Sequence, residues 1–341
     1  MAGAQDHKLA IAVARAGGLG SLPCAMLSPQ QLRDQMRQIR AKTKKPVNLN
    51  FFCHAPPAVD PAREAIWKKK LEPYYREFGL DPEGDYPAPN RAPFDDAMCA
   101  AVEDLKPEVV SFHFGLPEAR LLGRVRLAGA KIISSATTVR EARFLSEQGC
   151  DAIIAQGLEA GGHRGMFLET DVAMQPGTFA LVEQIAASVR VPVIAAGGIM
   201  DGRGVAAVMN LGASAAQPGT AYLLTPESTI SPVYRKALTE AKDDNTAITN
   251  VFSGRPARGI INRLMRELGP LSPDAPAFPR AAIAVAPLRA QAEAKGLGDF
   301  STLWAGQAAR LGRPLPAGEL TRLLAAEALE HLRRVGGADG R

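Results

Sequence analysis

The sequence predicts an α/β fold, a TIM-type (β/α)8 barrel with an insertion after the third strand and a C-terminal helical layer. Segment 191–224 is the strongest indication of this fold, because its residues predict a strand, a glycine loop, a helix, a second strand and a second glycine loop in turn. Short apolar runs also alternate with amphipathic helices through most of the preceding chain. With 341 residues, 46% of them hydrophobic, the chain can bury a large core, and such barrels reach this length as one domain.

Seven strands are assigned to apolar runs, at 18–22, 47–51, 109–114, 131–134, 151–156, 193–196 and 213–216. An eighth, the first along the chain, is expected in the opening residues. A helix predicted at 8–16 leaves little sequence for it. We therefore expect a shortened first strand.

Local signals mark where several helices begin and end. Ser28 and Gln31 are spaced as a capping box, and Thr138 with Glu141 forms a second. Asp201 can cap the helix between the last two strands. Gly212 stands where this helix needs a left-handed residue at its C-terminus.

Two regions depart from the alternation. Segment 55–93 is proline-rich and charged, is expected to contain one helix or two but no strand, and should cover or flank the barrel mouth. Residues beyond about 225 are expected to be mostly helical. The sequence therefore predicts a barrel domain at 1–225, which includes the insertion, and a C-terminal helical region at 226–341 packed on the barrel.

Composition excludes several functional classes. The net charge of +5 comes from scattered basic residues, and the cluster Lys68 to Lys70 is typical of a solvated helix face, so no nucleic-acid partner is expected. No apolar run approaches the roughly 18 residues of a membrane span, and no signal peptide is evident. The four cysteines are too widely spaced for a metal or disulfide site. We expect a cytoplasmic protein without a metal.

The two glycine loops of segment 191–224 are candidates for a phosphate site. Gly197 and Gly198 follow the seventh strand, and Gln217 to Thr220 follow the eighth. Phosphate is commonly held by these two loops of a (β/α)8 barrel, where glycine lets backbone N–H groups approach an anion. A Gly-Gly pair alone can also be an ordinary strand-to-helix turn. The second loop, with the hydroxyl of Thr220, favours the phosphate site.

Two histidines follow strands on the face where barrel enzymes place their active sites. His163 lies between glycines in the loop after the sixth strand, and can accept a proton or stabilise an anion. An exposed loop histidine is the alternative. His113, between two phenylalanines at the end of the fourth strand, is the second candidate, with a packed wall residue as its alternative. The remaining histidines, His7, His54 and His331, are interpreted as surface residues.

Six segments together resemble the FMN-dependent nitronate monooxygenases, formerly called 2-nitropropane dioxygenases. They are QGLEAGGHRG at 156–165, AAGGIMDGRG at 195–204, QPGTAYL at 217–223, SFHFGLP at 111–117, SSATT at 134–138 and GRPARGIIN at 254–262. The resemblance runs from Met1 through the LWAGQ segment at 303–307. Related FMN-dependent enoyl-ACP and quinone reductases share the barrel and phosphate loops but not the whole set.

The resemblance implies an FMN cofactor, a small nitronate substrate and dioxygen. His163, with His113 as second candidate, would position the nitronate or deprotonate a neutral nitroalkane beside the flavin, and the products would be a carbonyl compound and nitrite. The family's flavin contacts fall on Asn50, Gln156, Gly161, Gly198, Gln217, Pro218, Gly219 and Thr220. Ser135, Gly162 and Gly197 complete the predicted cofactor site, together with the backbone of Met1, Ala2 and Gly3.

Two departures from the family pattern stand out. The family places an apolar strand and a proline before the segment that corresponds to Met1 to Gly3, and Pro218 replaces a frequent methionine.

Two other functional classes stay open: an FMN-dependent NAD(P)H reductase, and a barrel without flavin that binds a phosphorylated ligand. The oligomer is expected to be a monomer or homodimer.

Overall fold

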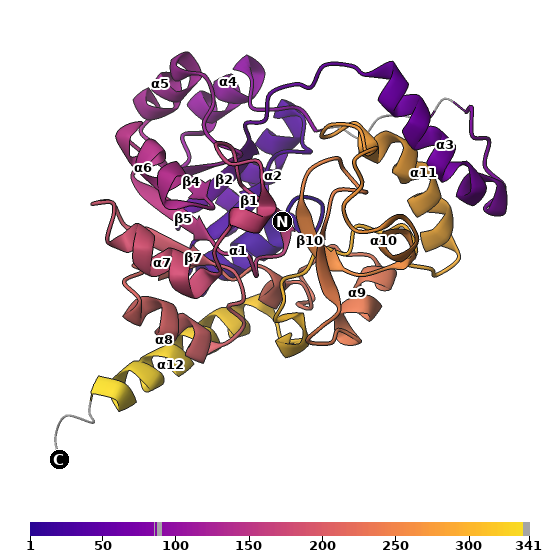
Figure 1. The fold of residues 1–341 in the computed structure, drawn as a ribbon. Helices are drawn as coiled ribbons and strands as arrows, with labels where there is room; N and C mark the ends of the chain where they lie inside the picture. Colours follow the sequence, from indigo (N-terminus) through magenta and orange to yellow (C-terminus); the bar gives the residue numbers. More distant parts are fainter. Residues whose placement is uncertain (85, 87–90, 337–341) are drawn as a thin grey trace.

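The computed structural model describes residues 1–84, 86 and 91–336 of the chain. A parallel sheet of seven strands curves through one half of the molecule (Figure 1). Its strands are β1 Gly20–Pro23, β2 Val47–Phe52, β3 Val109–His113, β4 Lys131–Ala136, β5 Ala152–Gln156, β7 Val193–Ala196 and β8 Ala215–Ala216. They pair in chain order from β1 to β8, with β5 directly beside β7. The predicted barrel-type α/β fold is thus confirmed.

The expected first strand was wrong, because the sheet contains no strand before Gly20 in the described residues. The opening residues pair elsewhere. The carbonyl oxygen of Ala4 accepts hydrogen bonds from the Thr229 backbone N–H at 3.0 Å and the Ser228 hydroxyl at 3.1 Å, and Gln5 forms a bridge with Ser228. These backbone groups are therefore satisfied by the segment after β8, and β1 and β8 form the two edges of the sheet.

A layer of helices covers the outside of the sheet. Its members are α1 His7–Arg15, α2 Pro29–Lys42, α4 Asp96–Leu105, α5 Ala119–Leu127, α6 Val139–Glu147, α7 Thr178–Ala186, α8 Gly202–Asn210 and α12 Ala317–Gly336. The last of these, α12, packs on α8 and α1, so the end of the described chain completes the layer (Figure 1). The largest apolar core lies between sheet and helices, around residues such as Leu49, Phe112, Ile132 and Ile153.

A second unit lies beside the barrel. Its antiparallel sheet has the order β6-β10-β9, with β6 Gly162–His163, β9 Thr246–Thr249 and β10 Ala257–Ile260. Its helices are α3 Pro61–Glu77, α9 Pro232–Thr239, α10 Arg263–Leu268 and α11 Ala281–Ala294; the short 3-10 turns of the chain are η1 Val172–Met174, η2 Thr220–Tyr222 and η3 Ala309–Leu311. Residues after 225 are thus not only helical, because β9 and β10 lie among them.

The insertion packs with this second unit. Its helix α3 lies along α11, far from the barrel strands (Figure 1). Trp67 and Leu71 of α3 share an apolar cluster with Leu288 and Phe300, which is separate from the barrel core. Part of the predicted insertion, residues 85 and 87–90, lies outside the described residues. The division of the chain at residue 225 stays a prediction.

Most helix signals behave as predicted. Ser28 and Gln31 form a reciprocal capping box, Asp201 accepts from the Gly204 N–H, and Gly212 is left-handed with φ +96°. The second capping box was wrong. Thr138 does cap α6, but the buried Glu141 carboxylate accepts from Thr137 and from the backbone N–H groups of Phe167 and Leu168. Glu141 therefore ties the loop that follows β6 to the barrel.

No helix in the described part of the chain is both long and apolar enough to cross a membrane.

Candidate active site

The loop between β5 and β6 folds back onto the carboxyl ends of the strands. Gln156, the last residue of β5, is buried and reaches across the loop with its side-chain amide. Its Nε2 donates to the His163 carbonyl oxygen at 3.0 Å, and its Oε1 accepts from the Gly165 N–H at 2.7 Å. These two partners fix the orientation of the amide. The predicted site residue Gln156 therefore acts as a clamp on the loop.

His113, the last residue of β3, supports the same carbonyl. Its Nε2 lies 3.1 Å from the His163 carbonyl oxygen and its Nδ1 lies 3.1 Å from the Ser135 hydroxyl on β4. A carbonyl oxygen only accepts, so Nε2 carries the proton and Nδ1 accepts from Ser135. The residue is partly exposed, but burial of its ring lowers its pKa to about 3. His113 is neutral near pH 7.

His163 is buried, with 8% of its surface exposed, which excludes the exposed-loop alternative. Strand β10 pairs with β6 so that Ala257 lies opposite His163. The ring Nε2 lies 2.9 Å from the Ser253 hydroxyl, and the rings of Phe278 and Trp304 lie 5.2 Å and 5.3 Å away between centroids. The side chain is thus held between the barrel and the second unit.

The electrostatic surroundings keep His163 neutral. Burial lowers its pKa well below the ordinary value, and the charges of Arg91 and Arg255 act in the same direction. Arg255 is itself largely enclosed, with its guanidinium 4.0 Å from the centre of the Phe114 ring, and burial lowers its pKa to about 10. A neutral imidazole can accept a proton at one nitrogen and donate from the other.

His54 was predicted to lie at the surface, and this was wrong. It is only 6% exposed, and its ring meets that of Phe278 edge to face at a centroid distance of 4.8 Å. Phe278 comes from the second unit, which covers the end of β2; a local reading of the sequence could not show this. Burial lowers the pKa of His54 to about 4. The other two histidines assigned to the surface, His7 on α1 and His331 on α12, are partly exposed.

The glycines of the predicted phosphate loops differ in what surrounds them. Gly197 and Gly198 have φ values of +127° and +69°, which L side chains rarely adopt. A Cβ at Gly197 would lie 2.5 Å from the Thr178 hydroxyl, whereas one at Gly219 would meet only the Met1 sulfur at 4.0 Å. Space therefore lies in front of Gly219, as a ligand that approaches the backbone requires.

A third segment joins these loops. The Gly306 N–H donates to the Thr220 hydroxyl oxygen at 3.0 Å, and the Gln307 N–H donates to the Glu159 carbonyl at 3.0 Å. A Cβ at Gly161 would lie 2.5 Å from the Gly306 nitrogen, so Gly161 is required for this close approach. Since the Thr220 oxygen accepts from Gly306, its own proton remains available to a ligand.

The remaining predicted site residues lie at the same end of the barrel. The Asn50 side-chain amide donates to the Ser111 hydroxyl at 2.8 Å and keeps some exposure. Ala2 packs against the cluster that contains Phe52, Phe114 and Phe278. Gly3 and Gly162 are left-handed, at φ +78° and +75°. Gln217 is exposed and Pro218 partly exposed.

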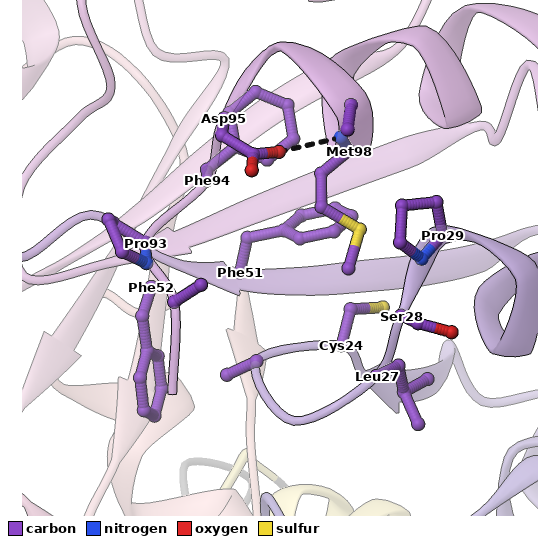
Figure 2. Close-up of a pocket in the computed structure, with 13 residues that line it drawn as sticks. Cys24, Leu27, Ser28, Pro29, Phe51, Phe52, Pro93, Phe94, Asp95 and Met98 are labelled. Carbon is purple, nitrogen blue, oxygen red and sulfur yellow. Dashed lines mark hydrogen bonds between the residues drawn. The ribbon is translucent and has the colours of Figure 1, made fainter. Parts of the chain in front are cut away.

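An apolar cavity of about 180 Å³ lies beside this region, between the ends of β1 and β2 and the starts of α2 and α4 (Figure 2). It is lined mainly by apolar side chains, including Leu27, Phe51, Phe94 and Met98. No predicted site residue lines it. Its wall at Phe52 is shared with the aromatic cluster around His163, since the Phe52 and His163 ring centres are 6.3 Å apart.

Several residues around His163 were missed by sequence reasoning. Ser253, Phe278 and Trp304 come from the second unit, in a region that was expected to be mostly helical. The GRPARGIIN and LWAGQ segments, which are near or include these residues, could have indicated them, because both segments contribute to the family resemblance. The described residues contain no group of three potential metal ligands.

Comparison with known proteins identifies the family. The nitronate monooxygenase family model matches residues 1–327. The chain belongs to the nitronate monooxygenase family. It is 44% identical to a nitronate monooxygenase from Paraburkholderia phytofirmans over 98% of this chain and 93% of that protein. It is 42% identical to a nitronate monooxygenase from Pseudomonas aeruginosa over 96% of this chain and 94% of that protein.

The fold agrees with this assignment. A crystal structure of nitroalkane oxidase from Streptomyces ansochromogenes superposes with a TM-score of 0.89, at 38% identity, over 98% of this chain and 95% of the other. Membership of the nitronate monooxygenase family makes the chain an oxidoreductase of a family that oxidises nitronates. Flavin dependence is a general property of this family.

The buried histidines predict a specific loss of stability in acid. An unfolded chain binds a proton at His113 near pH 6.5, whereas the folded chain resists protonation down to about pH 3. Between these values the unfolded state binds more protons, so stability falls as pH decreases, by up to about 1.4 kcal/mol per pH unit for this ring. We expect His113→Gln to show a shallower decline in the free energy of unfolding, measured by urea denaturation at pH 7, 6 and 5.

His331→Gln is the matched control, because it removes a partly exposed histidine and leaves His54, His113 and His163 in place. It should retain the wild-type slope. A slope in His113→Gln as steep as that of wild type would contradict the assignment of His113 as a buried neutral ring.

Proposed function

We propose that this chain binds FMN and converts alkyl nitronates, such as propionate 3-nitronate, to carbonyl compounds and nitrite with dioxygen. The observation that carries the proposal is His163, a buried neutral imidazole fixed at the carboxyl end of the sheet. The loops with the properties of a phosphate site adjoin it through Gly161 and Gly306. A cytoplasmic location and a monomeric or homodimeric state belong to the same proposal.

The described residues fit an FMN phosphate and ring. The backbone at Gly198, Gly219 and Thr220 would hold the phosphate, since these loops offer N–H groups and the space that a Cβ would fill at Gly219. Asn50, Gln156 and the backbone of Met1 to Gly3 would lie along the ring. Bound FMN supplies the redox centre that accepts electrons from the nitronate and delivers them to dioxygen.

His163 would perform the acid–base work. Its free nitrogen can remove the α-proton of a neutral nitroalkane, or donate a hydrogen bond to a nitro oxygen of a nitronate. His163 is buried, with the rings of Phe278 and Trp304 packed against it, and polar contacts are stronger where water is excluded. Both ring nitrogens of His113 are engaged, with His163 and Ser135. We therefore assign His113 a positioning role and His163 the contact with substrate.

The electron donor tests the proposal. The purified protein, loaded with FMN and kept free of oxygen, is mixed with a nitronate and, separately, with NADH. We expect the nitronate to bleach the flavin absorbance without any pyridine nucleotide, and NADH to act slowly or not at all.

Rapid bleaching by NADH with no response to nitronate would contradict the proposal and favour an NAD(P)H reductase. A colourless protein that FMN cannot reconstitute would favour a barrel that binds a different phosphorylated ligand. Formation of the product nitrite is measured in parallel, in the presence of air.

The phosphate loop gives a second test. Gly219 has φ −110°, which L residues adopt, and a Cβ there has room, so Gly219→Val should fold. Its isopropyl group would occupy the space in front of the backbone and displace hydrogen bonds to the phosphate. We expect FMN affinity to fall roughly 10- to 100-fold, measured by titration of flavin fluorescence.

Ser214→Val is the matched control. It adds a branched side chain to an exposed residue at the other end of β8, and should bind FMN as wild type does. Equal FMN affinity in Gly219→Val and wild type would remove Gly219 from the phosphate site.

A further inference from the structure

Ser253 forms a hydrogen bond with the ring of His163, and the proposed function assigns this bond no role. Ser253 is 2% exposed and lies in the turn between β9 and β10. Its hydroxyl lies 2.9 Å from His163 Nε2, and 3.4 Å from the Arg255 carbonyl oxygen. One hydroxyl therefore faces two partners, of which the carbonyl can only accept.

The turn that carries Ser253 is fixed on several sides. The Gly254 N–H donates to the Asn250 carbonyl at 2.7 Å, and a Cβ at Gly254 would lie 1.9 Å from the Pro276 carbonyl oxygen. The Asn250 side chain bonds to the backbone of Ser272 in both directions. Ser253 is thus anchored by the second unit.

The His163 backbone is anchored by the barrel. Its carbonyl receives the two hydrogen bonds from Gln156 and His113, and the next N–H, of Arg164, donates to the Pro256 carbonyl at 2.8 Å. With the backbone and Nε2 both held, the ring has a fixed orientation. Nδ1 has no hydrogen-bond partner among the described residues, so it is the nitrogen left for a substrate.

The two partners of the Ser253 hydroxyl define two proton arrangements. If the hydroxyl donates to Arg255, it accepts from His163 Nε2–H, and Nδ1 presents a lone pair. If the hydroxyl instead donates to Nε2, Nδ1 carries the proton. In the first arrangement Nδ1 can take a proton from a neutral nitroalkane: the C–H bond breaks, its electron pair stays on the substrate, which becomes the nitronate anion, an Nδ1–H bond forms, and the ring becomes a cation. The second donates a hydrogen bond to an oxygen of a nitronate that arrives as an anion.

We propose that Ser253 is a positioning residue that selects Nδ1 of His163 as the reactive nitrogen and lets it alternate between acceptor and donor. Other groups around the ring cannot replace it. Arg91 and Arg255 carry fixed positive charge, and His113 and His54 are neutral and face His163 without a bond to its ring nitrogens. Only Ser253 contributes a hydroxyl to Nε2 in the described part of the chain.

Ring nitrogen chemical shifts test the inference without catalysis. In protein labelled with 15N-histidine, the His163 signals are assigned by their loss in His163→Asn. In wild type we expect chemical shifts between those of the two neutral tautomers of the ring. The ratio of the two tautomers should change in Ser253→Ala and stay as in wild type in Ser253→Thr, which keeps the hydroxyl. Ser272→Ala, which removes another buried hydroxyl of the second unit, should leave the His163 signals unchanged.

The wild-type spectrum alone can overturn the inference, so a failure of Ser253→Ala to fold does not block the test. A ring held entirely in one neutral form from pH 6 to 9 contradicts the alternation. Identical His163 shifts in wild type and Ser253→Ala contradict the positioning role.

Kinetics add a second readout, which rests on the proposed function. Ser253→Ala should lose about tenfold or more in kcat/KM for a neutral nitroalkane and less for the matching nitronate, and Ser253→Thr should recover most of the loss. Equal losses for both substrates would indicate a merely structural role and contradict the inference. If wild type oxidises neither substrate, the proposed function fails, whereas the chemical shifts still decide the role of Ser253.

Discussion

The carbonyl oxygen of His163 is the point on which the site depends. It accepts from Gln156 at the end of β5 and from His113 at the end of β3, so two barrel strands hold one backbone group of a loop that they do not pair with. A buried carbonyl that lost these donors would carry an unmet desolvation cost. Gly162, left-handed at φ +75°, lets the loop turn back before His163, and Glu141 holds the far end of the loop through Phe167 and Leu168. The position of the His163 backbone is therefore set by side-chain hydrogen bonds from two barrel strands, while Nε2 of its ring is held by Ser253.

The same residue joins the two units. Strand β6 is only two residues long, yet it is the edge of a sheet whose other strands come from the C-terminal region. That region supplies Ser253, Phe278 and Trp304 around the imidazole, and its own core includes α3 of the insertion. The barrel thus contributes the two glycine loops predicted to bind phosphate and the side chains that hold the His163 carbonyl, while the second unit contributes the enclosure that lowers the pKa of His163. Neither unit builds the site alone.

The sequence was sufficient for the parts of this arrangement that follow a local period. The seven strands of the sheet, the cap at Ser28, the left-handed Gly212 and the place of His113 at the end of a strand all follow from residue spacing and turn chemistry. His163 was expected in a loop and instead lies in the two-residue strand β6. The sequence was insufficient where the contacting residues lie far apart along the chain. The opening residues pair with Ser228 and Thr229 instead of the sheet. Glu141 accepts hydrogen bonds from a remote loop, and His54 is covered by Phe278. Strand β9 has the residues TAIT, only one of them buried, so it lacks the apolar alternation that would have marked it.

A comparison of His163→Asn with wild type on the neutral and anionic forms of one nitroalkane tests the role of His163 most directly. Asparagine retains a hydrogen-bond donor but cannot act as the base, whose contribution is typically about 10²- to 10⁴-fold. We predict that the variant retains FMN, loses turnover of the neutral nitroalkane, and keeps measurable oxidation of the nitronate. Equal losses in kcat/KM for the two forms would contradict the base role, and no loss for either would remove His163 from the reaction.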